Sequence, residues 1–252
     1  MSKPEHHASE KVRLREKIEN ARKRGGRRLL ELLRHATALD DTDALVELGR
    51  HYQDGLKDSA GRDVVRRSEG PALKCFRRAA QLGDTNGMIL LATSLERLAL
   101  KQKPSARSSR RFAEAMSWER KALRRGNAFA AFNLAESYLN LGRANEAVRR
   151  FRSLAKAGDE DALLELAKAE LYGVGTKRDV AGAIGKLKVV ARKGSKVTEF
   201  DRALSMLLLA STAYHGWLVR RDFKTVVTWL RRATAAGSAA AKGMLEDLGD
   251  AV

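Results

Sequence analysis

The sequence predicts an all-α fold, a solenoid of about five stacked helix pairs, and three observations support this prediction. The chain has only three prolines and is rich in Ala, Leu, Arg, Lys and Glu, so helix formers prevail and strand-rich stretches are scarce. The second helix of each expected pair ends in a glycine followed by a small polar residue. The first helices share a register of their own.

A glycine after a basic and apolar helix marks the end of each helix pair. Glycine adopts positive φ at little cost, so it is the usual residue just past the last helical turn. A small or apolar side chain stands one turn before each glycine and belongs to a packing stripe. The glycines are Gly83, Gly126, Gly158, Gly194 and Gly237, and the residues one turn before them are Ala79, Ala122, Leu154, Val190 and Ala233.

A leucine followed by a small residue recurs in the first helix of each pair. The small residue allows a neighbouring helix to approach closely, because helix spacing depends on the side chains at the contact. Tyr52 and Tyr138 follow it one turn later and would fill the volume beside it. The recurring pairs are Leu48 with Gly49, Leu91 with Ala92, Leu134 with Ala135, Leu166 with Ala167, and Leu209 with Ala210.

The fourth pair reads LAKAELYGVGTKRDVAGA and the fifth YHGWLVRRDFKTVVTWLRRATAAG. These segments resemble the Sel1-like repeat family, which is related to the tetratricopeptide repeats. The resemblance covers residues 43–238 and implies a right-handed α-solenoid. Proteins of that family often act as adaptors or regulators in bacteria. The positions that match the family pattern are Gly173, Gly175, Asp179, Asp222 and the tryptophan position at Trp229.

The expected organisation follows from these repeats. Residues 1–25 form a basic N-terminal segment whose order the sequence leaves open, and residues 26–42 form a capping helix. About five repeats occupy residues 43–238, and residues 239–252 form a closing helix. Caps with one polar face are typical of solenoids. Insertions in the first two pairs are expected to lie in loops, among them the segment SARSSRR at 105–111.

The glycines of the fourth pair invite comparison with a phosphate-binding loop. A P-loop needs glycine directly before its lysine and a buried strand before the loop. Lys177 instead follows Thr176, and the preceding segment has helical character. We therefore interpret this stretch as a joint, with Gly173 and Gly175 in the turn and Asp179 capping the next helix.

Catalytic and metal-binding patterns are not recognisable, so we expect no enzyme, cofactor or metal site. The simplest interpretation of the single cysteine, Cys75, is a small core residue, and the alternative is a nucleophile. No serine stands in a nucleophile-elbow context. The histidines form no set with metal-ligand spacing within one helix face. They are His6, His7, His35, His51 and His215.

The net charge of +18 indicates an anionic partner, which could be nucleic acid, an anionic membrane or an acidic protein. Residues 97–125 are strongly basic, and a solvated loop is the alternative interpretation of their charge. Aromatic platforms for stacking bases are not interleaved with these arginines, so nucleic acid is the second choice. The candidate contacts to an acidic protein are Arg97, Arg107, Arg110 and Arg111.

The resemblance also implies a concave surface lined by the first helix of each pair. Mixed apolar and polar side chains there suit a protein or peptide ligand. Alternatively, the apolar series that includes Val46, Ile89 and Leu207 packs neighbouring first helices together. The candidate partner-binding residues on this surface are Arg50, Phe132, Glu136, Lys168, Tyr172, Tyr214 and His215.

The predicted function is that of a non-enzymatic scaffold that binds an acidic protein through the concave groove and basic loops. An adaptor is one form of this function, and an immunity protein that neutralises an acidic toxin is another. A cytoplasmic location is expected, because the polar N-terminus lacks the apolar core of a secretory signal. The apolar run at 203–219 is too short to span a membrane.

Overall fold

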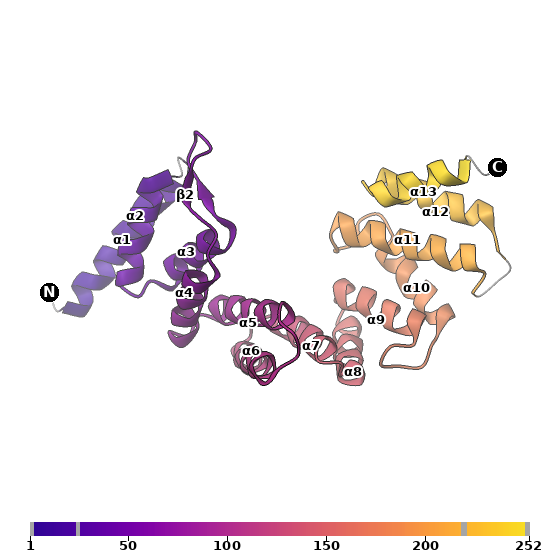
Figure 1. Cartoon of the computed structure of the whole chain (residues 1–252), viewed down its shortest axis with the longest axis horizontal. Helices are drawn as coiled ribbons and strands as arrows, with labels where there is room; N and C mark the ends of the chain where they lie inside the picture. The colour runs from indigo at the N-terminus through magenta and orange to yellow at the C-terminus, as the bar shows by residue number, and fades with distance from the viewer. Residues whose placement is uncertain (1–2, 24–25, 218–220, 250–252) are drawn as a thin grey trace. The chain divides into compact units, whose positions relative to one another are not determined.

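Helices make up almost all of the chain that the structure describes, residues 3–23, 26–217 and 221–249 (Figure 1). The structure is a computed structural model. It divides into two compact units, Met1–Asn133 and Leu134–Val252. We call them the N-terminal unit and the C-terminal unit and describe each by itself. The predicted all-α, helix-pair fold class is confirmed.

The N-terminal unit is a run of helices with one short hairpin, and each of its first five helices packs on the next one in sequence. The hairpin pairs Leu56 with Val65 and occupies the insertion of the first helix pair. The elements are α1 (Lys3–Arg22), α2 (Gly26–Ala38), α3 (Thr42–Asp54), β1 (Leu56–Lys57), β2 (Asp63–Val65), α4 (Glu69–Gln81), α5 (Thr85–Leu100) and α6 (Ala106–Arg124), followed by the start of α7 (Ala130–Asn140).

The basic N-terminal segment, whose order the sequence leaves open, contains helix α1. Leu14, Ile18 and Ala21 lie about one turn apart on α1 and are buried in a core cluster with side chains of α2 and α3. Arg22 at the end of α1 bonds to Glu47 on α3, with 2.6 Å between its Nη2 and the carboxylate Oε2. Apolar burial and this ion pair together dock α1 on the repeats.

The C-terminal unit continues the alternation of first and second helices. Besides its sequence neighbours, α9 contacts α11, so first helices of successive pairs touch. Leu164, Leu209 and Leu230 belong to one core cluster that joins α9, α11 and α12. The elements are the rest of α7, then α8 (Ala144–Lys156), α9 (Glu160–Tyr172), α10 (Val180–Val190), α11 (Glu199–His215), α12 (Phe223–Ala235) and α13 (Ala239–Gly249).

Helix α11 contains most of the apolar run at 203–219, and one of its faces is buried in the core. Ala203, Met206 and Ala210 are among the side chains on that face. No helix in the described ranges combines the length and the apolar character needed to cross a membrane.

The helix ends follow from local sequence. The five glycines that close the helix pairs all have positive φ, between 80° and 101°, and they are Gly83, Gly126, Gly158, Gly194 and Gly237. At the other end, Asp179 accepts a hydrogen bond from the Gly182 amide at 2.9 Å, and Asp222 accepts one from the Thr225 amide at 3.2 Å. These carboxylates satisfy amides that the first turns of α10 and α12 leave unpaired.

The glycine-rich joint of the fourth pair connects α9 to α10. Gly173 ends α9 in the left-handed region with φ 73°. Gly175 has φ 68° and approaches the start of α8 so closely that a Cβ there would lie 2.4 Å from the carbonyl carbon and oxygen of Ala144. The glycines therefore serve a tight turn and a close backbone approach between successive pairs.

One loop assignment from the sequence is wrong. The segment around Arg107, Arg110 and Arg111 was expected in an inserted loop, but α6 begins at Ala106 and includes all three. The reason is a capping box: the Ser105 hydroxyl accepts from the Ser108 amide, and the Ser108 hydroxyl accepts from the Ser105 amide. Serine replaces the usual Glu or Gln of this motif, which hides it in the sequence.

Candidate functional site

First and second helices of the C-terminal unit together form a groove of two adjoining apolar pockets, which we call the C-terminal groove. The pockets have volumes of about 390 and 480 Å³ and share Leu208 of α11. The first is lined by Leu139, Val148, Phe151, Glu165, Lys168, Ala169, Tyr172, Val174, Leu204 and Leu208. The second is lined by Leu207, Leu208, Ala210, Ser211, Tyr214, His215, Val226, Leu230, Met244, Asp247 and Leu248.

Helix α11 supplies the centre of this groove. Leu204, Leu208, Ser211 and His215 follow the three- and four-residue spacing that places side chains on one helix face. Leu204 and Leu208 are only half-buried, although the opposite face of α11 is in the core. Half-buried leucines in a concave site lose further contact with water when another apolar side chain packs on them, and this burial favours binding.

The few charges near the first pocket are mainly carboxylates. Lys168 pairs with Glu165 one turn earlier on α9, with 2.5 Å between Nζ and Oε1. Partial desolvation raises the pKa of Glu136 on α7, and the nearby Glu165 carboxylate raises it further, while Lys168 opposes both. Asp247 adds a carboxylate to the second pocket. The middle of the groove therefore carries little of the excess positive charge of the chain.

Aromatic side chains gather where α9 and α11 end, and we call this cluster the aromatic edge. The Tyr172 and Trp217 rings meet edge to face, with centroids 6.0 Å apart. His215 stacks on Trp217 at 5.3 Å and meets Tyr214 at 5.2 Å. Tyr214 also contacts Phe223 at 6.1 Å. The cluster thus brings together Tyr172, Tyr214 and His215, three residues that the sequence nominated separately.

Arginines stack on aromatic rings at the entrance to the second helix of each pair in this unit. Arg178 lies just before the Asp179 cap of α10, and Arg221 just before the Asp222 cap of α12. Such contacts attract the cation to the electron-rich ring face and limit its motion. The guanidinium carbons lie 4.8 Å (Arg143 over Tyr138), 5.0 Å (Arg178 over Trp217) and 5.6 Å (Arg221 over Tyr214) from the ring centres.

Arg178 and Arg221 keep their charge unneutralised despite the aspartate that follows each. The Asp179 carboxylate caps α10. Asp222 caps α12, and hydrogen bonds from the Thr225 side chain and amide lower the pKa of this aspartate. Within the described ranges, Arg178 and Arg221 form no ion pair with any carboxylate. Two cations without an ion pair therefore lie over rings of the aromatic edge, which adjoins the apolar groove.

The remaining nominated residues lie elsewhere. Phe132 on α7 is half-buried and belongs to the N-terminal unit. In that unit Arg50 is exposed on α3, and the half-buried Arg97 has its Nε 3.9 Å from the Glu69 carboxylate. Arg107 and Arg110 are exposed on α6, whereas Arg111 is half-buried and donates to the Leu98 carbonyl at 3.3 Å.

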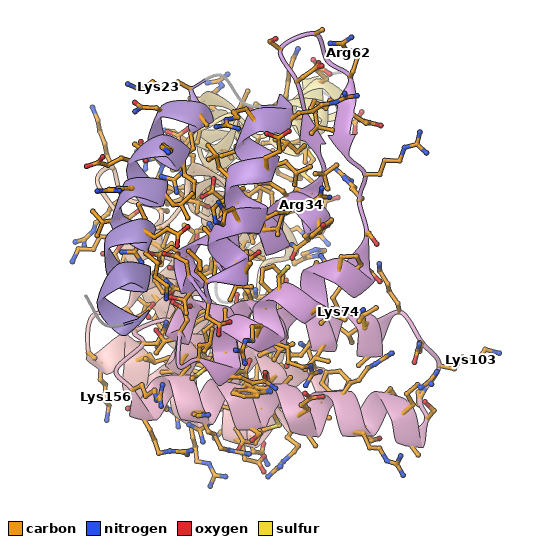
Figure 2. All side chains as sticks on the ribbon, turned by 90° about the vertical axis from the view of Figure 1, so that its left-hand side faces the viewer. Lys23, Arg34, Arg62, Lys74, Lys103 and Lys156 are labelled. Carbon is orange, nitrogen blue, oxygen red and sulfur yellow. The ribbon has the colours of Figure 1, made fainter. Side chains whose placement is uncertain are left out.

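Basic side chains also project from the connections within the helix pairs of the N-terminal unit. Figure 2 shows Arg62 near the tip of the hairpin and Lys103 ahead of α6, both pointing away from the helices. Arg62 is bonded to Asp58 at 2.9 Å. Exposed basic side chains thus stand on both connections, and Arg62 is paired with a carboxylate.

Sequence reasoning missed Trp217, Arg178, Arg221 and Leu208 as site residues. A signal existed for the arginines, because an Arg-Asp dipeptide precedes the second helix in both the fourth and fifth pairs. Nothing local indicates that Arg178 lies over Trp217, which is far along the chain. The spacing of Leu204 and Leu208 on α11 indicates an apolar stripe. The sequence does not indicate that these two side chains remain partly exposed.

Several solved structures resemble the chain, among them the following two. A protective antigen present in uropathogenic Escherichia coli strains, displaying an SLR fold, matches with a TM-score of 0.59 and 21% identity over 88% of this chain and 47% of its own. A Sel1 repeat protein from Oxalobacter formigenes matches with a TM-score of 0.57 and 20% identity over 81% of this chain and 74% of its own. The chain spans about half of the length of the E. coli antigen. No protein-family model and no curated protein matches it.

Proposed function

Since the chain has the Sel1-like repeat fold, we propose that it is a non-enzymatic scaffold that binds a partner protein in the C-terminal groove. The observation that carries this proposal is the pair of apolar pockets on either side of α11, with half-buried leucines between them. Apolar anchors in concave, water-excluding pockets supply most of the affinity in protein interfaces.

The groove geometry describes the segment that would fit. Because packed helices lie about 8–10 Å apart, anchors on the two sides of α11 are about 10 Å apart. Positions i and i+7 of a helix span about that distance, at 1.5 Å per residue. The partner segment therefore offers two large apolar side chains, one for the pocket at Leu204 and one for the pocket at Met244.

Charge supports an acidic partner. The net charge of +18 speeds and orients encounter with an acidic surface, while contacts at close range set the lifetime of the complex. The exposed Arg107 and Arg110 are available for such a surface. We assign the protein the role of a bacterial cytoplasmic adaptor, or of an immunity protein that covers an acidic toxin. The single cysteine fits a reducing compartment.

Affinity capture from the source cell, read by mass spectrometry, tests the groove. Leu208→Gln removes the anchor shared by both pockets, and Leu100→Gln is the matched control, because Leu100 is 58% exposed in the N-terminal unit. A partner should be recovered with the native chain and the control but not with Leu208→Gln. Equal recovery with both variants contradicts the groove as the binding site.

Nucleic acid is the second candidate ligand, since rings and arginines alternate at the aromatic edge. However, Arg178 and His215 already stack on Trp217, and Arg221 lies over Tyr214, so these rings are engaged within the protein. Base stacking needs an available ring face. A gel shift decides: binding that falls steeply with salt supports nucleic acid, and no shift at low salt removes it.

A further inference from the structure

We propose that Arg178 and Arg221 form an anion-binding pair for the carboxylates of an acidic peptide segment whose apolar residues occupy the C-terminal groove. This inference rests on the proposed scaffold function and deepens it, because it names the chemistry of the segment and the side of the groove on which its carboxylates lie. Four structural relationships support it.

The first is that Arg178 is held in place. Its Nε donates to the Leu171 carbonyl at 3.1 Å, and its guanidinium lies over Trp217. Its terminal nitrogens form no hydrogen bond among the described residues and remain as donors. An oriented guanidinium loses less conformational freedom when it binds and presents two parallel N–H groups to a carboxylate.

The second is that Arg221 occupies the corresponding position in the next helix pair and also lies over an aromatic ring, that of Tyr214. Like Arg178 it forms no ion pair among the described residues, and unlike Arg178 it forms no hydrogen bond among them. Both arginines precede a capping aspartate, Asp179 or Asp222, whose carboxylate serves a helix N-terminus. The two residues of the repeated Arg-Asp dipeptide thus have different roles. The aspartate caps the helix, and the arginine remains available to bind a ligand.

The third is continuity with the groove. Tyr172 and Val174 line the first pocket, and Tyr214 and His215 line the second, and these tyrosines belong to the same ring cluster as Trp217. A segment in either pocket therefore lies beside one of the two arginines. Aliphatic side chains suit the apolar lining, so a peptide fits the combined surface better than a nucleotide chain does.

The fourth is the uneven charge along the groove. Glu165 and Lys168 line the first pocket, and Glu136 lies close enough to both to interact with them electrostatically. The two arginines without an ion pair stand at the aromatic edge. Acidic residues of a ligand are repelled by the first region and attracted by the second. The acidic residues of the segment consequently lie on the side of the groove that carries Arg178 and Arg221.

Selection from a phage-displayed library of short random peptides tests the inference. The native chain serves as bait, and the Leu208→Gln chain removes peptides that do not need the groove. Enriched peptides are expected to combine apolar with acidic residues. A fluorescein-labelled copy of one such peptide is then titrated by anisotropy against Arg178→Gln/Arg221→Gln, with loss of about tenfold or more in affinity expected.

Arg149→Gln/Arg231→Gln is the matched control, since it removes the same charge from exposed arginines on α8 and α12. It should change affinity by about twofold or less, as expected for surface charges away from the ligand. Arg178→Lys keeps the charge and should still weaken binding, because lysine cannot make the paired contact. Circular dichroism confirms that each variant is folded before titration.

The possible failures are distinguishable. Groove-dependent peptides without acidic residues, or equal losses in the edge and control variants, overturn the anion-binding pair and leave the scaffold function in place. Absence of any peptide that depends on Leu208 overturns the groove and the scaffold function with it. If labelled oligothymidylate binds preferentially and needs Arg178 and Arg221, the ligand of the two arginines is nucleic acid. That result overturns the proposal that they bind an acidic peptide.

Discussion

Arg178 lies over the indole of Trp217, with its guanidinium carbon 5.0 Å from the ring centre, although the two residues belong to different helix pairs. Arg178 precedes α10 of the fourth pair, and Trp217 follows α11 of the fifth. The contact therefore links the joints of successive pairs and orients a cation beside the groove. It makes the aromatic edge part of the fold as well as a candidate binding surface.

A double-mutant cycle measures this link. Arg178→Ala and Trp217→Ala should each destabilise the chain, and the double variant should recover a coupling energy of about 0.5–1 kcal/mol, the usual value of an exposed cation–π contact. Urea unfolding followed by circular dichroism provides the free energies. Strictly additive losses would show that the two side chains do not interact in solution.

Substitution of Gly175 should be much more harmful than substitution of Gly185. Gly175→Ala forces a residue with a side chain to φ 68° and places its Cβ 2.4 Å from the Ala144 backbone, so we expect a loss of about 2 kcal/mol or more. Gly185 lies within α10, and a Cβ added there would meet no atom within 4 Å. Gly185→Ala should therefore stabilise by up to about 1 kcal/mol. Thermal melting that ranks the two variants the other way contradicts the close approach at Gly175.

Acid should weaken the docking of α1 through Glu47. Burial alone would raise the pKa of Glu47, but its interactions with His51 and Arg22 outweigh burial and lower the pKa from 4.5 to about 2. Because the folded-state pKa lies below the unfolded one, the stabilisation is complete above about pH 4.5 and is lost as pH falls toward 2. The loss amounts to at most about 3 kcal/mol.

Glu47→Gln is the variant that tests this pH dependence. Its unfolding free energy should lie below that of the native chain at neutral pH, and the difference should shrink across the acid range. Both chains share the remaining acid sensitivity, so only the difference between them is diagnostic. A difference that is independent of pH would show that Glu47 is not ionised beside Arg22.

Reversal of Arg107 and Arg110 tests the role of the basic helix α6. Arg107→Glu/Arg110→Glu should weaken binding of an acidic partner and reduce the dependence of the association rate on salt. Arg111 is left unchanged because it donates to the Leu98 carbonyl and supports the fold. Lys23→Glu/Arg34→Glu carries the same change of charge at exposed positions on or beside α1 and α2. Surface plasmon resonance compares the two double variants. Equal effects on binding would show that net charge alone, and not the position of Arg107 and Arg110, attracts the partner.

Helix ends were accessible from the sequence where a few neighbouring residues decide them. Gly83 and its four equivalents stop helices because glycine tolerates positive φ, and Asp179 caps α10 through an amide three residues away. The start of α6 was not accessible in this way, because Ser108 takes the place that glutamate usually occupies in a capping box. The packing of α1 on α2 and α3 could not be predicted from the sequence either, because the apolar stripe of α1 is narrow and lies within a highly charged segment.

Local sequence was enough to dictate the all-α repeat architecture, because helix propensity, glycine stops and small-residue registers act over a few residues and recur in every pair. What those repeats expose depends instead on how the folded chain packs. Leu204 and Leu208 became groove residues because no described side chain covers them fully, and Arg178 became an oriented cation because folding brings Trp217 beneath it. Both outcomes arise from contacts between residues distant in the chain, and no local pattern encodes them.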